Sequence, residues 1–226
     1  MSCLILDYII HLAALTNIDQ AELNPELAHK INCIGTRNVA EIAKKHNVPI
    51  IYLSTDNVFD GKSTSPYKPT DATNPINTYG RTKLEGEQEI IKATKKHYIL
   101  RTSWLYGNGG YVDAMLTFSN FRKKISVVDD QIGTPTNCAD VARKIIEYIK
   151  GNKPYGIYHL TSSGETSWSE FTKKIFEYRK RNVEVVSIEK SDFPRPAKRP
   201  QYCVLDSDDT LPDWKTSLQD YLTAKK

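Results

Sequence analysis

Short apolar runs alternate with amphipathic helical patterns along the first two-thirds of the chain. The runs have the length and continuity of strands buried on both faces, and they span residues 8–14, 48–54 and 98–104. Helical patterns lie between them at residues 24–45, opened by Asn24 as N-cap and Pro25 at the first helical position, and at residues 79–95. This alternation predicts an α/β protein with a doubly wound, Rossmann-like parallel sheet.

The pattern is looser after residue 110. Helices are predicted at residues 112–123, 137–150 and 168–181, and a short strand at residues 157–161. The connection over residues 56–78 is long and rich in proline, which is typical of functional loops. We expect one domain over residues 1–226, in which residues 1–110 form the Rossmann core and residues 111–226 mainly form a smaller, interleaved C-terminal portion.

Composition describes an ordinary globular chain. Its 226 residues are 39% hydrophobic and 26% charged, with a mean hydropathy of −0.49, which excludes disordered, collagen-like and membrane proteins. The net charge of +4 is too small to indicate nucleic-acid binding. Four scattered cysteines without a CxxC pair, and no signal-peptide pattern, predict a cytoplasmic protein with reduced thiols.

Phosphate loops and metal sites have recognisable spacings, and we expect neither here. There is no Gly-x-Gly-x-x-Gly, and the Walker-like spacing of Gly151 and Gly156 lacks the required Lys and Ser/Thr. No two of the five histidines stand three or four apart with a carboxylate, so no metal site is predicted. For His11, within a strand, a hydrogen-bonded core position is favoured over a ligand.

The strongest chemical signal is Tyr79 with Lys83, four residues later on one helix face. A lysine ammonium beside a phenol stabilises the phenolate, so we expect Lys83 to lower the pKa of Tyr79 from its usual value near 10. Thr55, at the carboxyl end of the preceding strand, can hydrogen-bond the same substrate oxygen. Tyr-x-x-x-Lys alone is a weak motif that solvated side chains also satisfy, and its placement after Thr55 strengthens it.

Six ordered segments carry a resemblance to a known family: HLAALTNIDQAE, LSTDNVFDG, YGRTKLEGE, RTSWLYG, VVDDQIGTPT and RPAKRPQYCVLD. They resemble the dTDP-4-dehydrorhamnose reductases, which are extended short-chain dehydrogenase/reductases and share their fold with the regulatory β subunit of methionine adenosyltransferase. The resemblance implies an NAD(P)-binding domain that reduces the 4-keto group of dTDP-6-deoxy-L-lyxo-4-hexulose to dTDP-L-rhamnose, for polysaccharide biosynthesis. NADPH or NADH is the implied cofactor, with Mg²⁺ and a homodimer as further family options.

The resemblance also implies roles for individual residues. Tyr79 is the proton donor, Lys83 is its partner and the nicotinamide-ribose anchor, and Thr55 is the hydroxyl on the carbonyl side. The cofactor would be lined by Ala14, Leu15 and Thr16 together with Tyr79 and Lys83. The substrate would be touched by Thr55, Asp56 and Trp104.

Several matched positions have two interpretations. Trp104 is either a core aromatic or a substrate contact, and the polar turn at residues 130–136 either caps the next helix or adjoins the nucleotide-sugar. Arg195, Lys198 and Arg199 form either a solvated basic loop or a diphosphate site.

Two asparagines add open questions. Asn32 is a helix-face amide or, less favoured, part of a proton relay. Asn57 stands where the family usually has tyrosine, which puts one local contact in doubt.

The family pattern begins before the first predicted strand of this chain. About 50–60 residues with a glycine-rich pyrophosphate turn would precede residue 8, so we expect an N-terminally truncated sheet and weak NADPH binding. The strand at residues 8–14 should be an apolar edge that promotes self-association. A regulatory, non-catalytic homologue or an inactive truncated remnant is therefore the alternative to an active reductase.

Overall fold

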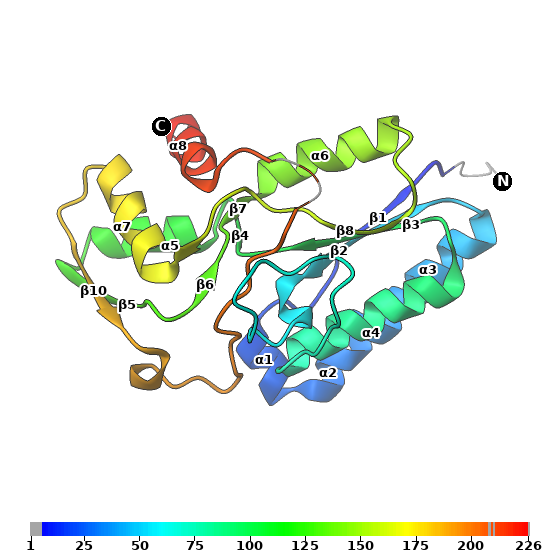
Figure 1. Cartoon of the computed structure of the whole chain (residues 1–226), viewed down its shortest axis with the longest axis horizontal. Coiled ribbons are helices and arrows are strands. Elements are labelled where there is room, and N and C mark those ends of the chain that lie inside the picture. The colour runs from blue at the N-terminus through cyan, green and yellow to red at the C-terminus, as the bar shows by residue number, and fades with distance from the viewer. Residues whose placement is uncertain (1–5, 208, 210, 226) are drawn as a thin grey trace.

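The computed structural model describes residues 6–207, 209 and 211–225 of the chain. Its centre is a parallel sheet with strand order β1-β2-β3-β8 (Figure 1). The strands are β1 (Ile9–His11), β2 (Ile50–Thr55), β3 (His97–Thr102) and β8 (Gly156–His159). All neighbouring pairs in it are parallel, so the carboxyl ends of the strands meet at one edge, as the α/β prediction requires.

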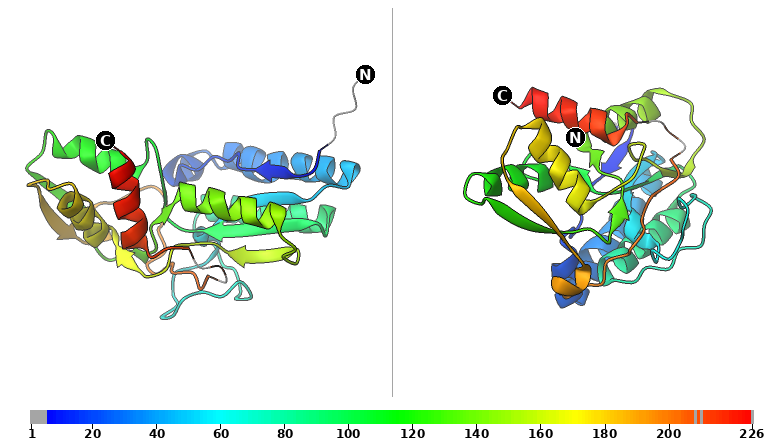
Figure 2. Two further views of the ribbon diagram at one scale, coloured as in Figure 1. Left: turned by 90° about the horizontal axis from the view of Figure 1, so that it is seen from above. Right: turned by 60° about the vertical axis from the view of Figure 1, so that its left-hand side comes forward.

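Helices cover both faces of this sheet. The helices α3 (Thr36–His46) and α4 (Thr78–Ala93) lie on one face and α6 (Cys138–Lys150) on the other (Figures 1 and 2). Each face buries its own core: Tyr52 and Ile90 belong to the α3/α4 side, and Leu100 and Ile145 to the α6 side. This two-faced burial explains why β2 and β3 read as continuous apolar runs.

Residues 25–46 form three successive helical pieces, where the sequence predicts one helix. They are α2 (Pro25–His29), the π-helix η1 (Lys30–Gly35) and α3, and the short α1 (Ile18–Leu23) precedes them. Pro25 opens α2 as expected, but the Asn24 side chain donates to the Gln20 carbonyl instead of capping α2. The wider turn of η1 changes which side chains face α4.

The second half forms a separate apolar core beside the main sheet. It contains α5 (Tyr111–Ser119), α7 (Trp168–Tyr178) and α8 (Trp214–Ala224). Its strand pairs are β4 (Leu105–Tyr106) with β7 (Thr136–Asn137), β5 (Lys124–Val128) with β10 (Glu184–Ile188), and β6 (Ile132–Gly133) with β9 (Thr166–Ser167). The short 3₁₀ helices are η2 (Asp56–Val58) and η3 (Lys190–Asp192). Because α6 and β8 return to the main sheet, the two portions interleave.

Several element boundaries differ from prediction. The first strand covers only Ile9–His11 of residues 8–14. Helix α5 ends at Ser119, short of the predicted residue 123, and β5 begins at Lys124. Four longer elements, α1, β5, β10 and α8, were not predicted from the sequence. The pair β5–β10 joins segments 60 residues apart and leaves most of its side chains partly exposed, so neither strand has a strong apolar signal.

Strand β1 lies at one edge of the four-stranded sheet. Ile10 and Leu12, in and just after it, are 45% and 57% exposed. An exposed apolar edge was expected from the sequence, and the self-association derived from it stays a prediction. No helix in the described part of the chain is long and apolar enough to cross a membrane.

Candidate functional site

A cleft of about 510 Å³ lies at the carboxyl ends of β1, β2 and β3. This is the end of a parallel sheet at which α/β proteins bind ligands. The residues assigned from the sequence that line it are Ala14, Thr16, Thr55, Asp56, Tyr79, Lys83 and Trp104. Leu15 is not among the residues that line this cleft. Sequence positions spread over 90 residues therefore meet in one place.

Thr55 and Asp56 occupy the end of β2, where the strand turns into η2. The Thr55 hydroxyl donates to Asp56 Oδ1 at 3.0 Å and accepts from the Asn57 backbone N–H at 3.1 Å. Ser103 Oγ donates to the other Asp56 oxygen at 2.8 Å. Burial raises the pKa of the Asp56 carboxyl, and these hydrogen bonds oppose the rise. Thr55 is thus fixed at the floor of the cleft.

Tyr79 stands in the first turn of α4, which Asn77 caps by accepting from the Gly80 N–H at 2.8 Å. Burial raises the pKa of the Tyr79 phenol to about 12, the nearby Asp56 adds to the rise, and the Thr55 hydroxyl opposes it. The expected lowering by Lys83 is wrong for this arrangement, because Lys83 turns its ammonium elsewhere. Tyr79 is consequently protonated, and able to donate, throughout the neutral range.

Lys83 is buried to 2% exposure and points toward β2. Its Nζ donates to the Leu53 carbonyl at 2.8 Å and lies 3.9 Å above the centre of the Tyr52 ring. Burial lowers the pKa of the Lys83 amine to about 7, and Glu87 only partly opposes this. A lysine that titrates near neutral pH is available both as a cation and as a neutral donor.

Glu87, one turn beyond Lys83, is itself buried and paired. Arg101 on β3 donates to its two carboxylate oxygens at 3.1 and 2.8 Å, and Ser54 Oγ donates to it at 2.5 Å. Hydrogen bonds from this many donors offset the cost of burying a carboxylate charge. The Glu87 carboxylate is therefore paired with Arg101 and Ser54, and it forms no ion pair with the Lys83 amine.

The loop that follows β1 is held by Asn32 of η1. Asn32 Oδ1 accepts from the Leu15 N–H at 2.7 Å, and Asn32 Nδ2 donates to the Leu15 carbonyl at 3.2 Å and to Thr82 Oγ1 at 3.1 Å. The fully buried Asn32 thus joins the loop to α4 as an amide on one helix face, and a part in a proton relay stays the less favoured prediction. His11 is hydrogen-bonded in the core to Thr36 Oγ1 at 2.9 Å, as the sequence analysis favoured.

Trp104 forms one wall of the cleft together with an aromatic that the sequence analysis missed. Its indole stacks on Trp168 with ring centres 3.8 Å apart and an 11° interplanar angle. Its φ of 43° is unusual for a bulky residue, and such strain is found preferentially at functional sites. Gly133 leaves room for it, since a Cβ there would stand 2.5 Å from the Trp104 ring. Trp168 was overlooked because it begins a helix 64 residues away.

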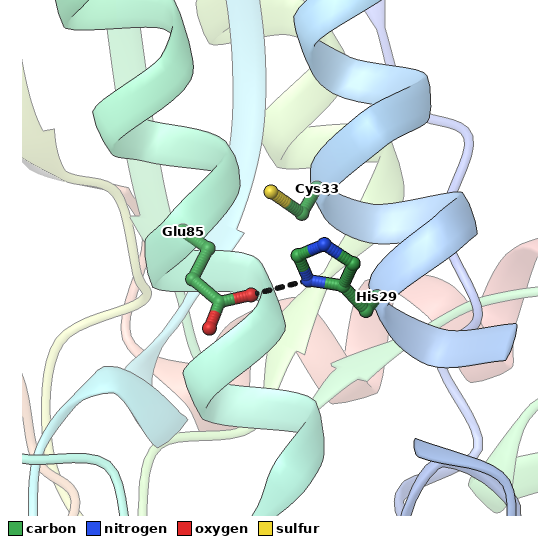
Figure 3. A group of neighbouring side chains, drawn as sticks. All are labelled: His29, Cys33 and Glu85. Carbon is green, nitrogen blue, oxygen red and sulfur yellow. Dashed lines mark hydrogen bonds and ion pairs between the residues drawn. The ribbon is translucent and has the colours of Figure 1, made fainter. Parts of the chain in front are cut away.

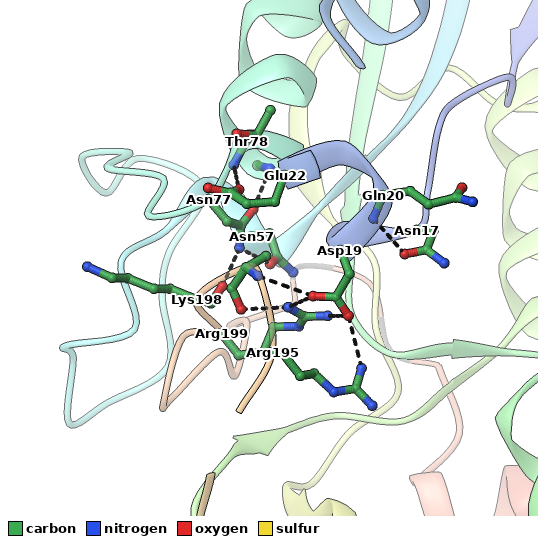
Figure 4. Close-up of polar contacts among 12 residues, drawn as sticks. Asn17, Asp19, Gln20, Glu22, Asn57, Asn77, Thr78, Arg195, Lys198 and Arg199 are labelled. Atoms are coloured by element: carbon green, nitrogen blue, oxygen red, sulfur yellow. Dashed lines mark hydrogen bonds and ion pairs between the residues drawn. The ribbon is translucent and has the colours of Figure 1, made fainter. Parts of the chain in front are cut away.

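The basic loop over residues 195–199 is bound to α1 by ion pairs (Figure 4). Arg199 forms a forked pair with Asp19 at 2.8 and 2.9 Å, and Arg195 approaches the same carboxylate at 3.4 Å. The backbone carbonyl of Lys198 accepts from Asn77 Nδ2 at 2.9 Å. Arg199 lines the cleft but is already paired with Asp19, so the loop is not simply solvated.

Asn57 and Cys203 are two further residues at the cleft that the sequence analysis did not assign to it. Asn57 Nδ2 donates to Asp56 Oδ1 at 2.8 Å. Asn57 Oδ1 accepts from Asn77 Nδ2 at 2.9 Å, a contact that Figure 4 shows. Asn57 thus forms an amide bridge between η2 and the start of α4. Gln131 from the polar turn also lines the cleft, and Asn137 caps α6.

Known proteins match the chain over nearly its whole length. The family model described as RmlD substrate binding domain matches residues 4–226. The dTDP-4-dehydrorhamnose reductase of Sinorhizobium fredii is 39% identical over 93% of this chain and 78% of that protein, and that of Escherichia coli K12 is 35% identical over 94% and 78%. The crystal structure of the Bacillus anthracis dTDP-4-dehydrorhamnose reductase in complex with NADP superimposes with a TM-score of 0.94 at 39% identity, covering 96% of this chain and 80% of that one. The chain therefore belongs to the dTDP-4-dehydrorhamnose reductase family.

Proposed function

We propose that this protein reduces the 4-keto group of dTDP-6-deoxy-L-lyxo-4-hexulose with NAD(P)H and so forms dTDP-L-rhamnose, a step in polysaccharide biosynthesis. The observation that carries the proposal is the single cleft in which Thr55, Tyr79 and Lys83 meet. Family membership supports the substrate, and the relatives include a spore coat polysaccharide biosynthesis protein of Bacillus subtilis.

The cleft suits the nicotinamide half of the cofactor. Ala14 and Thr16 line it beyond β1, and Lys83 lines the same cleft with a buried amine. Bound NAD(P)H supplies the hydride. We assign Ala14, Thr16, Tyr79 and Lys83 to cofactor binding, with Leu15 acting through its backbone, which Asn32 fixes.

The protein's own chemistry is proton delivery. Hydride addition at a ketone carbon leaves an alkoxide, which takes a proton as it forms. Tyr79 is protonated at neutral pH, because its pKa is raised to about 12, so it donates that proton and becomes a phenolate. Lys83, whose amine is held by the Leu53 carbonyl, serves as the anchor for the nicotinamide ribose, and the Thr55 hydroxyl orients the carbonyl oxygen. A proton from solvent then restores the phenol.

Asp56 and Trp104 are assigned to the substrate. Both line the cleft, and Trp104 offers a flat face beside Trp168 on which a sugar or base ring can pack. Asp56 is fixed by Thr55, Asn57 and Ser103, so its position does not depend on the ligand. These contacts support binding of a nucleotide-sugar.

The test is NADPH consumption with the dTDP-4-keto sugar as substrate. Tyr79→Phe keeps the ring and removes the donor, so turnover should fall by roughly 10²-fold or more with little change in substrate binding. Tyr155→Phe, at an exposed phenol remote from the cleft, is the matched control and should keep its activity. Near-native turnover of Tyr79→Phe would show that Tyr79 is not the acid. If the wild type binds dTDP-sugars but never consumes NADPH, the regulatory alternative replaces the enzyme.

A cytoplasmic location, a homodimer, and the absence of nucleic-acid and membrane partners stay predictions from the sequence. The boundary near residue 110 between the Rossmann core and the substrate-binding portion also stays a prediction.

A further inference from the structure

Three side chains of metal-ligating types meet outside the cleft, between α4 and the α2–η1 segment (Figure 3). They are His29 at the end of α2, Cys33 in η1 and Glu85 on α4, and their ligand atoms all lie within 4.8 Å of one another. Figure 3 shows all three side chains pointing into the space between α4 and the α2–η1 segment. Glu85 is 52 residues from Cys33 in the sequence, so no local spacing motif announces the group.

The cluster is open to solvent on one side and closed on the other. Cys33 is 8% exposed, whereas the side chains of His29 and Glu85 are 50% and 32% exposed. A metal ion can therefore reach the group, bind the thiolate at its inner end and keep a fourth position for water. Three protein ligands and one open position is a common zinc arrangement.

The observed spacing needs only small adjustments. Tetrahedral zinc places its nitrogen, oxygen and sulfur ligands about 3.3–3.6 Å apart, given bond lengths of roughly 2.0–2.3 Å. His29 Nδ1 and Glu85 Oε2 are now 2.8 Å apart and share a proton, which a cation would replace. The pair must open by about half an ångström and the thiol must approach by up to about one. Rotation of these side chains provides both movements.

The donor set selects the class of metal. A thiolate with an imidazole and a single carboxylate favours a borderline ion such as Zn²⁺ over Mg²⁺, which prefers oxygen ligands. Nearby charges are mixed, because Glu89 favours a cation whereas Arg37 and Lys92 oppose it. The thiol of Cys33 must release its proton to the buffer when the metal binds.

We propose that His29, Cys33 and Glu85 form a Zn²⁺ site that clamps the α2–η1 segment to α4. This departs from the sequence-based expectation of no metal site. The alternative is a simple His29–Glu85 ion pair beside a buried cysteine. A clamp here would act on packing that already matters to the cleft, since η1 holds the Leu15 loop through Asn32 and α4 carries Tyr79 and Lys83. Metal binding at this site can be tested without measuring the reductase reaction.

Co²⁺ is the probe, because a cobalt–thiolate bond gives a near-ultraviolet charge-transfer band and tetrahedral coordination gives visible bands. The full chain, stripped of metal, should bind one Co²⁺ with both signals, and Zn²⁺ should displace it. Cys33→Ser should abolish the charge-transfer band, and His29→Ala and Glu85→Ala should each weaken binding by about tenfold or more. Cys138→Ser, at an exposed cysteine elsewhere, is the control and should retain the band.

A thermal shift provides a second readout. Zn²⁺ should raise the melting temperature of the wild type and of Cys138→Ser but not that of Cys33→Ser, because a ligand that binds only the folded state stabilises it. Absence of the charge-transfer band in the wild type, or its persistence in Cys33→Ser, would overturn the proposal. So would equal thermal shifts in Cys33→Ser and Cys138→Ser.

Discussion

Replacing Lys83 by methionine should stabilise the fold while damaging the reaction. Methionine has a similar length and carries no charge, so it fills the space between α4 and β2 without the amine. Burial lowers the pKa of Lys83 from 10.5 to about 7. A shift of this size corresponds to about 5 kcal/mol at about 1.4 kcal/mol per pH unit. Burying the protonated Lys83 side chain therefore lowers the free energy of unfolding of the wild type by about this amount.

The sign of the pH dependence follows from where the proton is held. Between about pH 7 and 10.5 the unfolded chain keeps the Lys83 proton whereas the folded chain has lost it. Stability contributed by this group consequently rises as pH increases through that window, and the full penalty applies below pH 7. Lys83→Met lacks the penalty but leaves the Leu53 carbonyl, now 2.8 Å from Nζ, without its donor, at a cost of about 1–3 kcal/mol. The variant should therefore be about 3 kcal/mol more stable than wild type below pH 7. This advantage should shrink as pH rises and reverse at high pH, where only the cost of the unpaired Leu53 carbonyl, about 1–3 kcal/mol, remains.

Urea unfolding followed by tryptophan fluorescence, at several pH values from about 6 to 9, measures this difference directly. Lys45→Met, at an exposed lysine of α3, is the control and should follow the wild-type pH curve. A stability difference between wild type and Lys83→Met that does not change with pH would refute the argument. Cofactor binding should weaken in Lys83→Met, and NADPH consumption should fall by roughly 10²-fold, because the amine that anchors the nicotinamide ribose is lost.

Three further changes test other parts of the cleft. Thr55→Val removes the hydroxyl without changing shape, so initial rates should drop about tenfold, less than for Tyr79→Phe; an unchanged rate would contradict the role of Thr55. Gly133→Ala places a Cβ 2.5 Å from the Trp104 ring, so it should alter tryptophan fluorescence, raise KM for the nucleotide-sugar and cost about 1–3 kcal/mol of stability. Gly35→Ala, whose Cβ meets nothing closer than 3.6 Å, is the control and should not destabilise the protein. Equal effects of the two substitutions would contradict this packing. Asp19→Asn weakens the forked pair with Arg199 and should lower the free energy of unfolding by about 1–2 kcal/mol at neutral pH. Because Arg199 lowers the pKa of Asp19, this difference should shrink when acid protonates the wild-type carboxylate. A difference that does not change with pH would contradict the ion pair.

Local pattern was sufficient for the parts of the fold in which burial is continuous. Strands β2 and β3 lie between helical layers and carry uninterrupted apolar runs, and α4 and α6 carry one apolar face each, so their sequences alone predict them. Thr55, Tyr79 and Lys83 were recognisable for a related reason. A strand end followed by a helix start fixes their relative positions through the parallel sheet itself.

Contacts between distant segments were decided only by the tertiary structure. Trp168 stacks on Trp104, Asp19 pairs with Arg199, and Glu85 meets His29 and Cys33, although nothing in the local sequence around any of them predicts the partner. The charge states of the cleft also depend on the fold. Tyr79 and Lys83 stand four residues apart, but burial raises the pKa of the phenol and the Leu53 carbonyl draws the amine toward β2. Sequence spacing brings two groups onto one helix face, whereas the surrounding packing determines desolvation and hydrogen-bond partners, and those set the pKa values.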